Sequence, residues 1–214
     1  MICGVDEAGK GSVLGPMVIA AVGISSEDIL EGIRVRDSKL LSAKERERLY
    51  KIIKKKCQVA TVRLDAQQID IMRRDMTLNE AVARSHAQVI IKLSPDYAYL
   101  DACDVNTFRY GEMVKNHLVQ PCEIISEHHA DEKFPVVSAA SIIAKVTRDR
   151  AITTLAKKYG TIGSGYPSDP VTIHFLNSYI DEYSVPPPIA RKSWKTVSAI
   201  LSRKSQRNLD DFTI

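Results

Sequence analysis

Two adjacent carboxylates stand where a short apolar run at the start of the chain ends. Asp6 and Glu7 follow the run 2–5 and precede a glycine-containing loop and a second apolar run, 17–22. This order predicts a strand, a polar corner and a second strand. Because neighbouring like charges are unfavourable unless a cation or hydrogen-bond donors stabilise them, the pair indicates a cation site.

Two further acids occupy comparable places. Asp101 ends the apolar segment 97–100, and Asp131 lies in a polar segment just before a long helical pattern. A fold that gathers the four acids at one edge of a sheet would offer the hard oxygen ligands that Mg²⁺ and Mn²⁺ prefer. Two such ions can activate water and stabilise the leaving oxygen of a phosphodiester. A second interpretation stays open, since acids at strand ends also serve as caps and turn formers.

The same stretch resembles a nucleotide-binding loop. Gly4, Gly9 and Lys10 match most of the pattern G-x-x-x-x-G-K-[ST], but Gly11 replaces the hydroxyl that would hold Mg²⁺. Asp6 and Glu7 would also lie inside the loop and repel the phosphates. A nucleotide triphosphatase is therefore the disfavoured alternative, which tight ATP binding would revive.

Strands and helices alternate along the chain. Apolar runs predict strands at 17–24, 58–64, 97–101 and 121–126, and helical spacing predicts helices near 42–55, 77–93, 135–158 and 193–202, with a short helix capped by Asp65. The opening strands are joined too tightly for a crossover, which predicts an α/β fold whose mixed sheet is flanked by helices. From Arg203 the chain is polar, and we expect it to be unstructured in isolation.

Composition limits the class of protein. The 214 residues are 44% hydrophobic and 26% charged, which fits one sizeable core. A net charge of +4 permits a nucleic-acid partner without requiring one. The four cysteines form no CxxC pair, so we expect reduced, mostly buried thiols. No apolar run reaches the roughly 18 residues of a membrane span, and we expect a soluble, cytoplasmic protein without membrane contact.

Several motifs in order resemble the ribonuclease HII family, most closely its archaeal members. They are residues 6–11 with Gly15-Pro16, Asp37-Ser38-Lys39, Leu100-Asp101, the run 130–141, Lys145-Val146 with Arg148-Asp149, and the run 163–170. The resemblance covers the whole chain. It implies a ribonuclease H-like fold with a C-terminal helical portion, and cleavage of the RNA strand in RNA/DNA hybrids and at ribonucleotides embedded in duplex DNA.

The resemblance also implies residue roles. Asp6, Glu7, Asp101 and Asp131 match the metal-binding catalytic acids, which would hold two Mg²⁺ or Mn²⁺ ions and leave 3′-hydroxyl and 5′-phosphate ends. Main-chain groups of Gly9, Lys10 and Gly11, with Tyr166, match the residues that sense the 2′-hydroxyl; many members carry arginine at the place of Lys10. We expect a catalytic domain at 1–185, a helical segment at 186–204 and a flexible tail at 205–214, in a monomer.

Basic and polar side chains are candidate substrate contacts. Lys39, Ser138, Ser141, Lys145 and Arg148 could bind phosphates, although a lysine on a helix surface is often only solvated. The segment 191–207 carries Arg191, Lys192, Lys195, Arg203, Lys204 and Arg207 and could bind the duplex backbone, which predicts binding that weakens as salt rises. Trp194 is interpreted as a packing anchor rather than a base-stacking platform. His128 and His129 lie near Asp131 and could serve the site.

The tail carries an independent motif. Gln206, Leu209 and Phe212 fit Q-x-x-[LIM]-x-x-[FY], which resembles the box that binds the sliding clamp PCNA, with Thr213 at the place of a second aromatic residue. Leu209 and Phe212 would share one helical face. A polar tail without a partner is the alternative. A non-catalytic nucleic-acid-binding adaptor on the same fold is the alternative for the whole chain.

Overall fold

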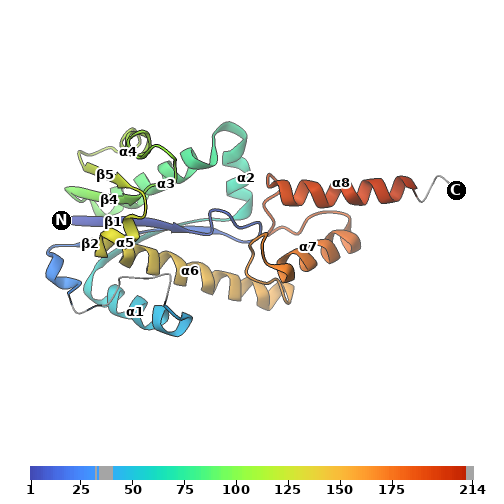
Figure 1. Ribbon diagram of the computed structural model, residues 1–214, viewed down its shortest axis with the longest axis horizontal. Coiled ribbons are helices and arrows are strands. Elements are labelled where there is room, and N and C mark those ends of the chain that lie inside the picture. Colours follow the sequence, from blue (N-terminus) through green and yellow to red (C-terminus); the bar gives the residue numbers. More distant parts are fainter. Residues whose placement is uncertain (32, 34–40, 211–214) are drawn as a thin grey trace. The chain divides into compact units, whose positions relative to one another are not determined.

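The computed structural model describes residues 1–31, 33 and 41–210 (Figure 1). In this part of the chain the strands are β1 (Ile2–Ala8), β2 (Met17–Ile24), β3 (Gln58–Leu64), β4 (Tyr97–Asp101) and β5 (Glu123–Glu127). The helices are α1 (Ala43–Lys56), α2 (Ala66–Asp75), α3 (Leu78–Leu93), α4 (Thr107–Lys115), α5 (Ala130–Lys133), α6 (Pro135–Tyr159), α7 (Pro170–Tyr183) and α8 (Lys195–Asp210), with a short 3₁₀ turn at Glu27–Ile29.

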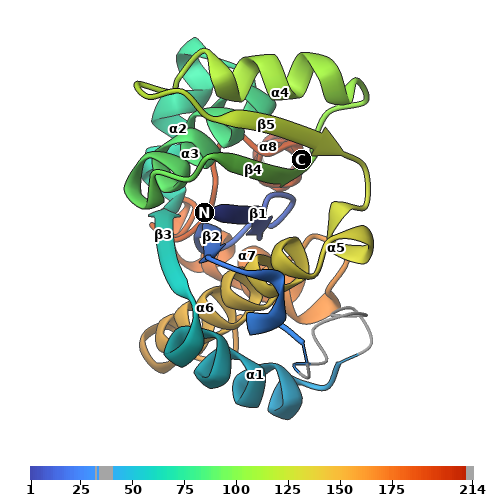
Figure 2. The same cartoon turned by 90° about the vertical axis from the view of Figure 1, so that its left-hand side faces the viewer.

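The described strands form one mixed sheet in the order β3-β2-β1-β4-β5, and Figure 2 shows β5, β4, β1 and β2 side by side. The tight connection makes β1 and β2 antiparallel, with Ile2 opposite Ile24 and Ala8 opposite Val18. Strand β1 pairs in parallel with β4, and β4 pairs in parallel with β5. The predicted mixed α/β sheet is therefore confirmed. The carboxyl ends of the parallel strands β1 and β4 lie at the same end of the sheet.

Two compact units divide the chain. The first contains residues 1–8, 18–63 and 76–148, and its helices cover both faces of the sheet: α3 and α4 lie on one side, and α1 and the first part of α6 lie on the other (Figure 1). Its core joins β1 and β2 to Leu49 and Ile53 of α1 and to the small and aliphatic residues of α6. Residues with even numbers in β1 face α6, as Gly4 shows by its contact with the main chain of Val136 and Val137.

The second unit contains residues 9–17, 64–75 and 149–214, of which the structure describes those up to 210. Its core is built from Val13 and Leu14 of the β1–β2 loop and from apolar residues of α6, α7 and α8. Trp194 packs against this core, and the guanidinium of Arg191 lies 4.9 Å from its ring centroid. The interpretation of Trp194 as a packing residue is confirmed.

Most of the predicted elements are confirmed, including the strands 17–24 and 58–64. The prediction of an unstructured chain from Arg203 is wrong for residues 203–210, since α8 continues to Asp210. Helices α4 and α7 were not predicted, although Asn106 and Asp169 are the capping residues that begin them. The division at residues 185 and 204 stays a prediction.

The prediction for the cysteines is confirmed in part. All four cysteines are free, as predicted, but only Cys3 is buried, and Cys57, Cys103 and Cys122 are partly exposed. Among the described residues, no helix has the length and apolar character needed to cross a membrane.

Candidate active site

Asp6 and Asp101 belong to neighbouring parallel strands. Asp101 is the last residue of β4, whereas Asp6 lies within β1, which continues past the predicted corner to Ala8. The register pairs Val5 with Leu100, so the next residue of each strand is one of these acids. Asp101 Oδ1 accepts a hydrogen bond from the main-chain N–H of Ala130 at 3.0 Å. Asp131 is the next residue, at the start of α5, and it is 6% exposed. The sheet edge and α5 thus bring the predicted acids Asp6, Asp101 and Asp131 into one region.

The environment of Asp6 disfavours a bare negative charge. Burial raises the pKa of its carboxyl well above the usual range, and the carboxylates of Glu7 and Asp101 raise it further. The nearby Ser141 hydroxyl and the Glu7 N–H, which donates to Asp6 Oδ1 at 2.7 Å, oppose this rise in the pKa. A proton or a cation is therefore required to balance the charge of this cluster.

Glu7 points to the opposite face of the sheet because successive strand residues alternate. Its Oε2 lies 3.1 Å from Nε2 of His86 on α3. The other ring nitrogen of His86, Nδ1, lies 3.1 Å from the hydroxyl of Tyr110 on α4. The side chains of His86 and Tyr110 are both fully buried, so Glu7 is held from the face of the sheet that α3 and α4 cover.

The donor chemistry fits a hard divalent ion. Four carboxylates offer oxygen ligands, and the electrostatic cost at Asp6 would be relieved by a cation. Within the described residues, no group of three or more His, Cys, Asp or Glu side chains stands close enough to enclose an ion in this conformation.

The glycine loop belongs to the second unit and is fixed by a buried arginine. Arg191 is fully buried, and its guanidinium donates to the carbonyls of Gly9 (2.7 Å), Lys10 (2.8 Å) and Gly15 (3.2 Å). Gly9 adopts φ of 84°, a conformation that favours glycine. The main chain of this loop is thus held in a defined shape. The prediction that Arg191 binds the duplex backbone is wrong, because its charge is used inside the unit.

Tyr166 lies in a loop joined to the glycine loop by main-chain hydrogen bonds. The Gly165 carbonyl accepts from the N–H groups of Val13 (2.8 Å) and Leu14 (3.0 Å). Asp169 begins α7 and accepts from the Ser164 and Val171 N–H groups, and the first of these lowers the pKa of its carboxyl to about 2. The structure therefore brings Gly9, Lys10, Gly11 and Tyr166 together in one unit.

The other predicted substrate contacts are dispersed. Ser138 and Ser141 are completely buried on α6, so neither hydroxyl is accessible to a phosphate in this conformation. Lys145 is partly buried and Arg148 is 5% exposed, while Lys39 lies outside the described residues. His128 is exposed, and its Nε2 lies 3.3 Å from the carbonyl of Val105.

Parts of the C-terminal basic segment and of the tail motif lie on α8. Lys204 Nζ lies 2.5 and 2.8 Å from the carbonyls of Ile180 and Asp181, so it binds the C-terminal end of α7. Gln206 is exposed on α8, Leu209 belongs to the same helix, and Phe212 lies outside the described residues.

The phosphate-loop alternative does not fit the backbone. Gly4 and Glu7 are inner residues of β1, paired with Val22 and Ile19 of β2, so this segment cannot curl around a phosphate. The sequence analysis missed two buried polar residues, His86 and Tyr110, and assigned Arg191 to the wrong role. The available signal was a histidine on the apolar face of a helix, which is also typical of an ordinary core residue.

The fold is that of ribonuclease H-like proteins. The crystal structure of the ribonuclease H2 from Pyrococcus horikoshii OT3 is similar, with a TM-score of 0.89 and 38% identity over 96% of this chain and 99% of that one. A chain of the PCNA:RNase HII complex from Archaeoglobus fulgidus is similar with a TM-score of 0.86 and 41% identity, over 91% of this chain and 95% of that one.

Sequence comparison gives the family. The model of the ribonuclease HII family matches residues 3–197. The ribonuclease HII of Methanoregula boonei is 68% identical over 212 residues, which are 99% of this chain and 100% of the relative. This chain belongs to the ribonuclease HII family and is an enzyme, an endonuclease of the hydrolase class.

Proposed function

We propose that this enzyme cleaves the RNA strand of RNA/DNA hybrids, and ribonucleotides embedded in duplex DNA, by hydrolysis with two divalent metal ions. Asp6, Glu7, Asp101 and Asp131 would hold Mg²⁺ or Mn²⁺, and the products would carry 3′-hydroxyl and 5′-phosphate ends. The observation that supports this most is the place of Asp6 and Asp101 directly after the paired residues Val5 and Leu100, where burial and neighbouring carboxylates raise the pKa of Asp6 and leave a charge to be balanced.

The chain's own residues would orient the ligands. The Glu7 N–H holds the Asp6 carboxylate, and the Ala130 N–H holds that of Asp101. The bound ions would supply an activated water and stabilise the leaving 3′ oxygen. Because the carboxylates are fixed before the substrate arrives, less reorganisation would be needed during the reaction.

Recognition of RNA would rest on the second unit. The 2′-hydroxyl is the group by which a protein can distinguish RNA from DNA. Gly9, Lys10 and Gly11 would present main-chain groups to this hydroxyl, together with Tyr166. The hydrogen bonds that Arg191 donates and those that the Gly165 carbonyl accepts support the proposal, because they hold both loops in place without a substrate.

Cleavage assays test the activity. Duplexes that carry one ribonucleotide, four ribonucleotides or none are incubated with the protein in Mg²⁺ and then in Mn²⁺, and the product ends are mapped. We expect cleavage of the ribonucleotide-containing duplexes only, and its loss in Asp6→Asn. Equal cleavage of the all-DNA duplex would contradict the role of the 2′-hydroxyl. Metal-dependent cleavage that survives Asp6→Asn would favour a different site, and binding without cleavage would favour an adaptor.

We also propose that the tail binds a sliding clamp through Gln206, Leu209 and Phe212. We further propose that the enzyme acts as a cytoplasmic monomer. Gln206 is exposed on α8, and the similar chain from Archaeoglobus fulgidus was solved in a PCNA:RNase HII complex. Deletion from residue 206 onward should abolish clamp binding in calorimetry and leave cleavage of free hybrid unchanged. Unchanged clamp affinity after this deletion would refute the proposal, and light scattering tests the monomer.

A further inference from the structure

Glu7 contacts helix α3 through His86, and its partners form a buried chain. Glu7 Oε2 lies 3.1 Å from His86 Nε2, and His86 Nδ1 lies 3.1 Å from the Tyr110 hydroxyl. The two rings meet edge to face at 5.7 Å and 85°. Both side chains are 0% exposed, so the chain is shielded from solvent up to Glu7.

The hydrogen-bond chemistry gives this chain a direction. An ionised carboxylate only accepts hydrogen bonds, so the proton of the imidazole facing Glu7 must be on Nε2. In the neutral ring Nδ1 is then an acceptor, and the Tyr110 hydroxyl is the donor that satisfies it. Burial raises the pKa of Tyr110 well above its usual range, so the hydroxyl keeps its proton at neutral pH. The Tyr110 hydroxyl therefore satisfies the tautomer in which Nε2 donates to Glu7.

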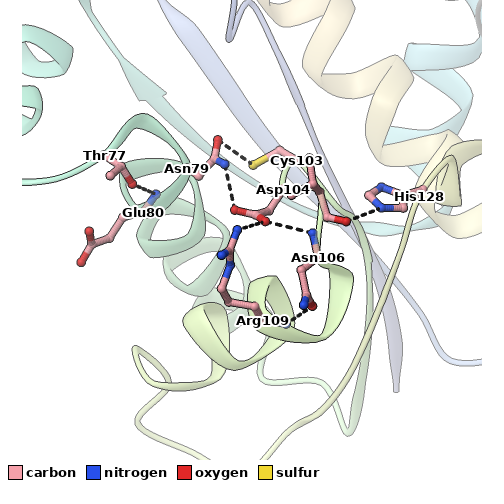
Figure 3. Close-up of polar contacts among 9 residues, drawn as sticks. Thr77, Asn79, Glu80, Cys103, Asp104, Asn106, Arg109 and His128 are labelled. Atoms are coloured by element: carbon pink, nitrogen blue, oxygen red, sulfur yellow. Dashed lines mark hydrogen bonds and ion pairs between the residues drawn. The ribbon is translucent and has the colours of Figure 1, made fainter.

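A second set of contacts ties the β4–α4 loop to α3 (Figure 3). Asn79 of α3 donates to Asp104 at 3.0 Å, and the Cys103 thiol lies 3.9 Å from the Asn79 carbonyl oxygen. Asp104 also accepts from the Asn106 N–H at 3.0 Å and pairs with Arg109, and the first of these lowers the pKa of its carboxyl to about 2. The contacts fix α4 against α3, which fixes Tyr110 against His86.

We propose that His86 and Tyr110 are positioning residues that hold Glu7 Oε2 and thereby direct Oε1 toward a divalent ion at the sheet edge. The proposal rests on the assignment of Glu7 as a metal ligand made above. Partners that orient a metal-binding group commonly change metal affinity by about 10- to 100-fold when they are lost. Neither residue touches the substrate in this role.

Metal binding without substrate tests the proposal. We expect His86→Leu, which keeps much of the volume and removes the donor, to raise the Mn²⁺ dissociation constant measured by calorimetry by about 10- to 100-fold. Tyr110→Phe keeps the ring and should shift it in the same direction by a smaller factor, and His86→Gln, which retains a terminal N–H donor, should recover part of the affinity. Ser85→Ala is the matched control: Ser85 is buried beside His86 on α3, and its hydroxyl donates to the Ala81 carbonyl at 2.8 Å.

A second readout separates positioning from simple packing. In protein labelled with ¹⁵N-histidine, the His86 ring should show its proton on Nε2, and Tyr110→Phe should shift the Nδ1 resonance. A proton on Nδ1 in the wild-type protein would overturn the proposal. If His86→Leu does not fold in a thermal denaturation assay, the Mn²⁺ affinity of Tyr110→Phe decides: a wild-type value overturns the proposal.

Glu7→Gln separates the assignment of Glu7 as a metal ligand from the positioning role of His86 and Tyr110. If Glu7→Gln binds Mn²⁺ as tightly as the wild type, the assignment of Glu7 as a ligand fails. If Glu7→Gln binds weakly while His86→Leu and Tyr110→Phe bind as the wild type does, only the positioning role fails. Weakened binding in all three variants, with Ser85→Ala unchanged, supports the proposal.

Discussion

In the metal-free chain, ionising the buried Asp6 carboxyl costs more folding free energy than ionising an acid on the surface does. Its side chain is almost fully buried, and burial raises its pKa, with Glu7 and Asp101 adding to the shift. A carboxyl whose folded-state pKa lies above its unfolded value binds its proton more tightly in the folded chain. Its contribution to stability is therefore complete below the unfolded pKa and is lost as the pH rises through the folded pKa.

Asp6→Asn should consequently raise the melting temperature of the metal-free protein at pH 7 while lowering metal-dependent cleavage by more than about 100-fold. The amide stays neutral at every pH, so the gain should shrink as the pH falls toward about 4, the unfolded pKa of aspartate. Calorimetry in EDTA from pH 4 to pH 8 measures it. Asp28→Asn, at an exposed acid, is the control, and a lower melting temperature for Asp6→Asn at pH 7 would contradict the argument.

The second unit also contains a buried charged side chain, Arg191, which donates hydrogen bonds to three main-chain carbonyls. Lysine keeps the charge but not the planar fork, so Arg191→Lys should release at least one of the Gly9, Lys10 and Gly15 carbonyls. Hydrogen bonds to charged groups contribute about 1.5–3 kcal/mol, so we expect cleavage at a single embedded ribonucleotide to fall about 10- to 100-fold. Mn²⁺ binding should not change. Arg150→Lys, at an exposed arginine, is the matched control, and wild-type cleavage by Arg191→Lys would refute this role.

These residues show what the sequence can and cannot predict about the site. Asp6, Asp101 and Asp131 were found because a strand end or a helix start is visible in a local pattern. His86 is 79 residues from Glu7, so their contact depends on the pairing of helix and sheet. Arg191 was misread because a charge in a polar segment is usually solvated, whereas here main-chain carbonyls satisfy it.

At the scale of the elements, helix-capping residues were the sequence signal that predicted helix starts most reliably. Ser42 accepts from the Glu45 N–H, Thr77 from that of Glu80, and Asp65 from that of Gln68, as the local sequence predicts. The same chemistry was available for α7, where Asp169 precedes Pro170. The length of α8 was underestimated because its polar residues give little amphipathic pattern after residue 202.

The approach of β1 to α6 depends on one missing side chain. A Cβ at Gly4 would lie 2.3 Å from the carbonyl carbon of Val136 and 2.4 Å from the Val137 nitrogen, and these main-chain atoms cannot move alone. Gly4→Ala should therefore separate β1 from α6 and destabilise the protein by about 3 kcal/mol or more, at the upper end of overpacking effects. Urea denaturation measures this. Gly11→Ala, where a Cβ would meet nothing within 4 Å, is the control, and equal stability of the two variants would contradict the argument.

At the scale of the whole molecule, the two units are interleaved in sequence. The chain leaves the first unit after Ala8, returns at Val18, leaves again after Arg63, returns at Met76 and enters the second unit finally within α6, at Asp149. Hydrophobic patterns predict elements but not which distant elements share a core, so boundaries drawn as continuous ranges could not describe this arrangement. The carboxylates lie in one unit and the glycine loop in the other, although only Ala8 separates Glu7 from Gly9 in the chain.

This interleaving predicts that the second unit does not fold from its C-terminal segment alone. Val13 and Leu14 are 0% exposed in its core, and each contributes about 1.5–3 kcal/mol of burial. A fragment of residues 149–214 lacks them and also lacks Gly9 and Gly15, so the buried charge of Arg191 would lose its carbonyl partners. We expect this fragment to show no dispersed amide spectrum by NMR and no cooperative melting, whereas the full chain shows both. A folded fragment would mean that the loop between β1 and β2 is dispensable for this core.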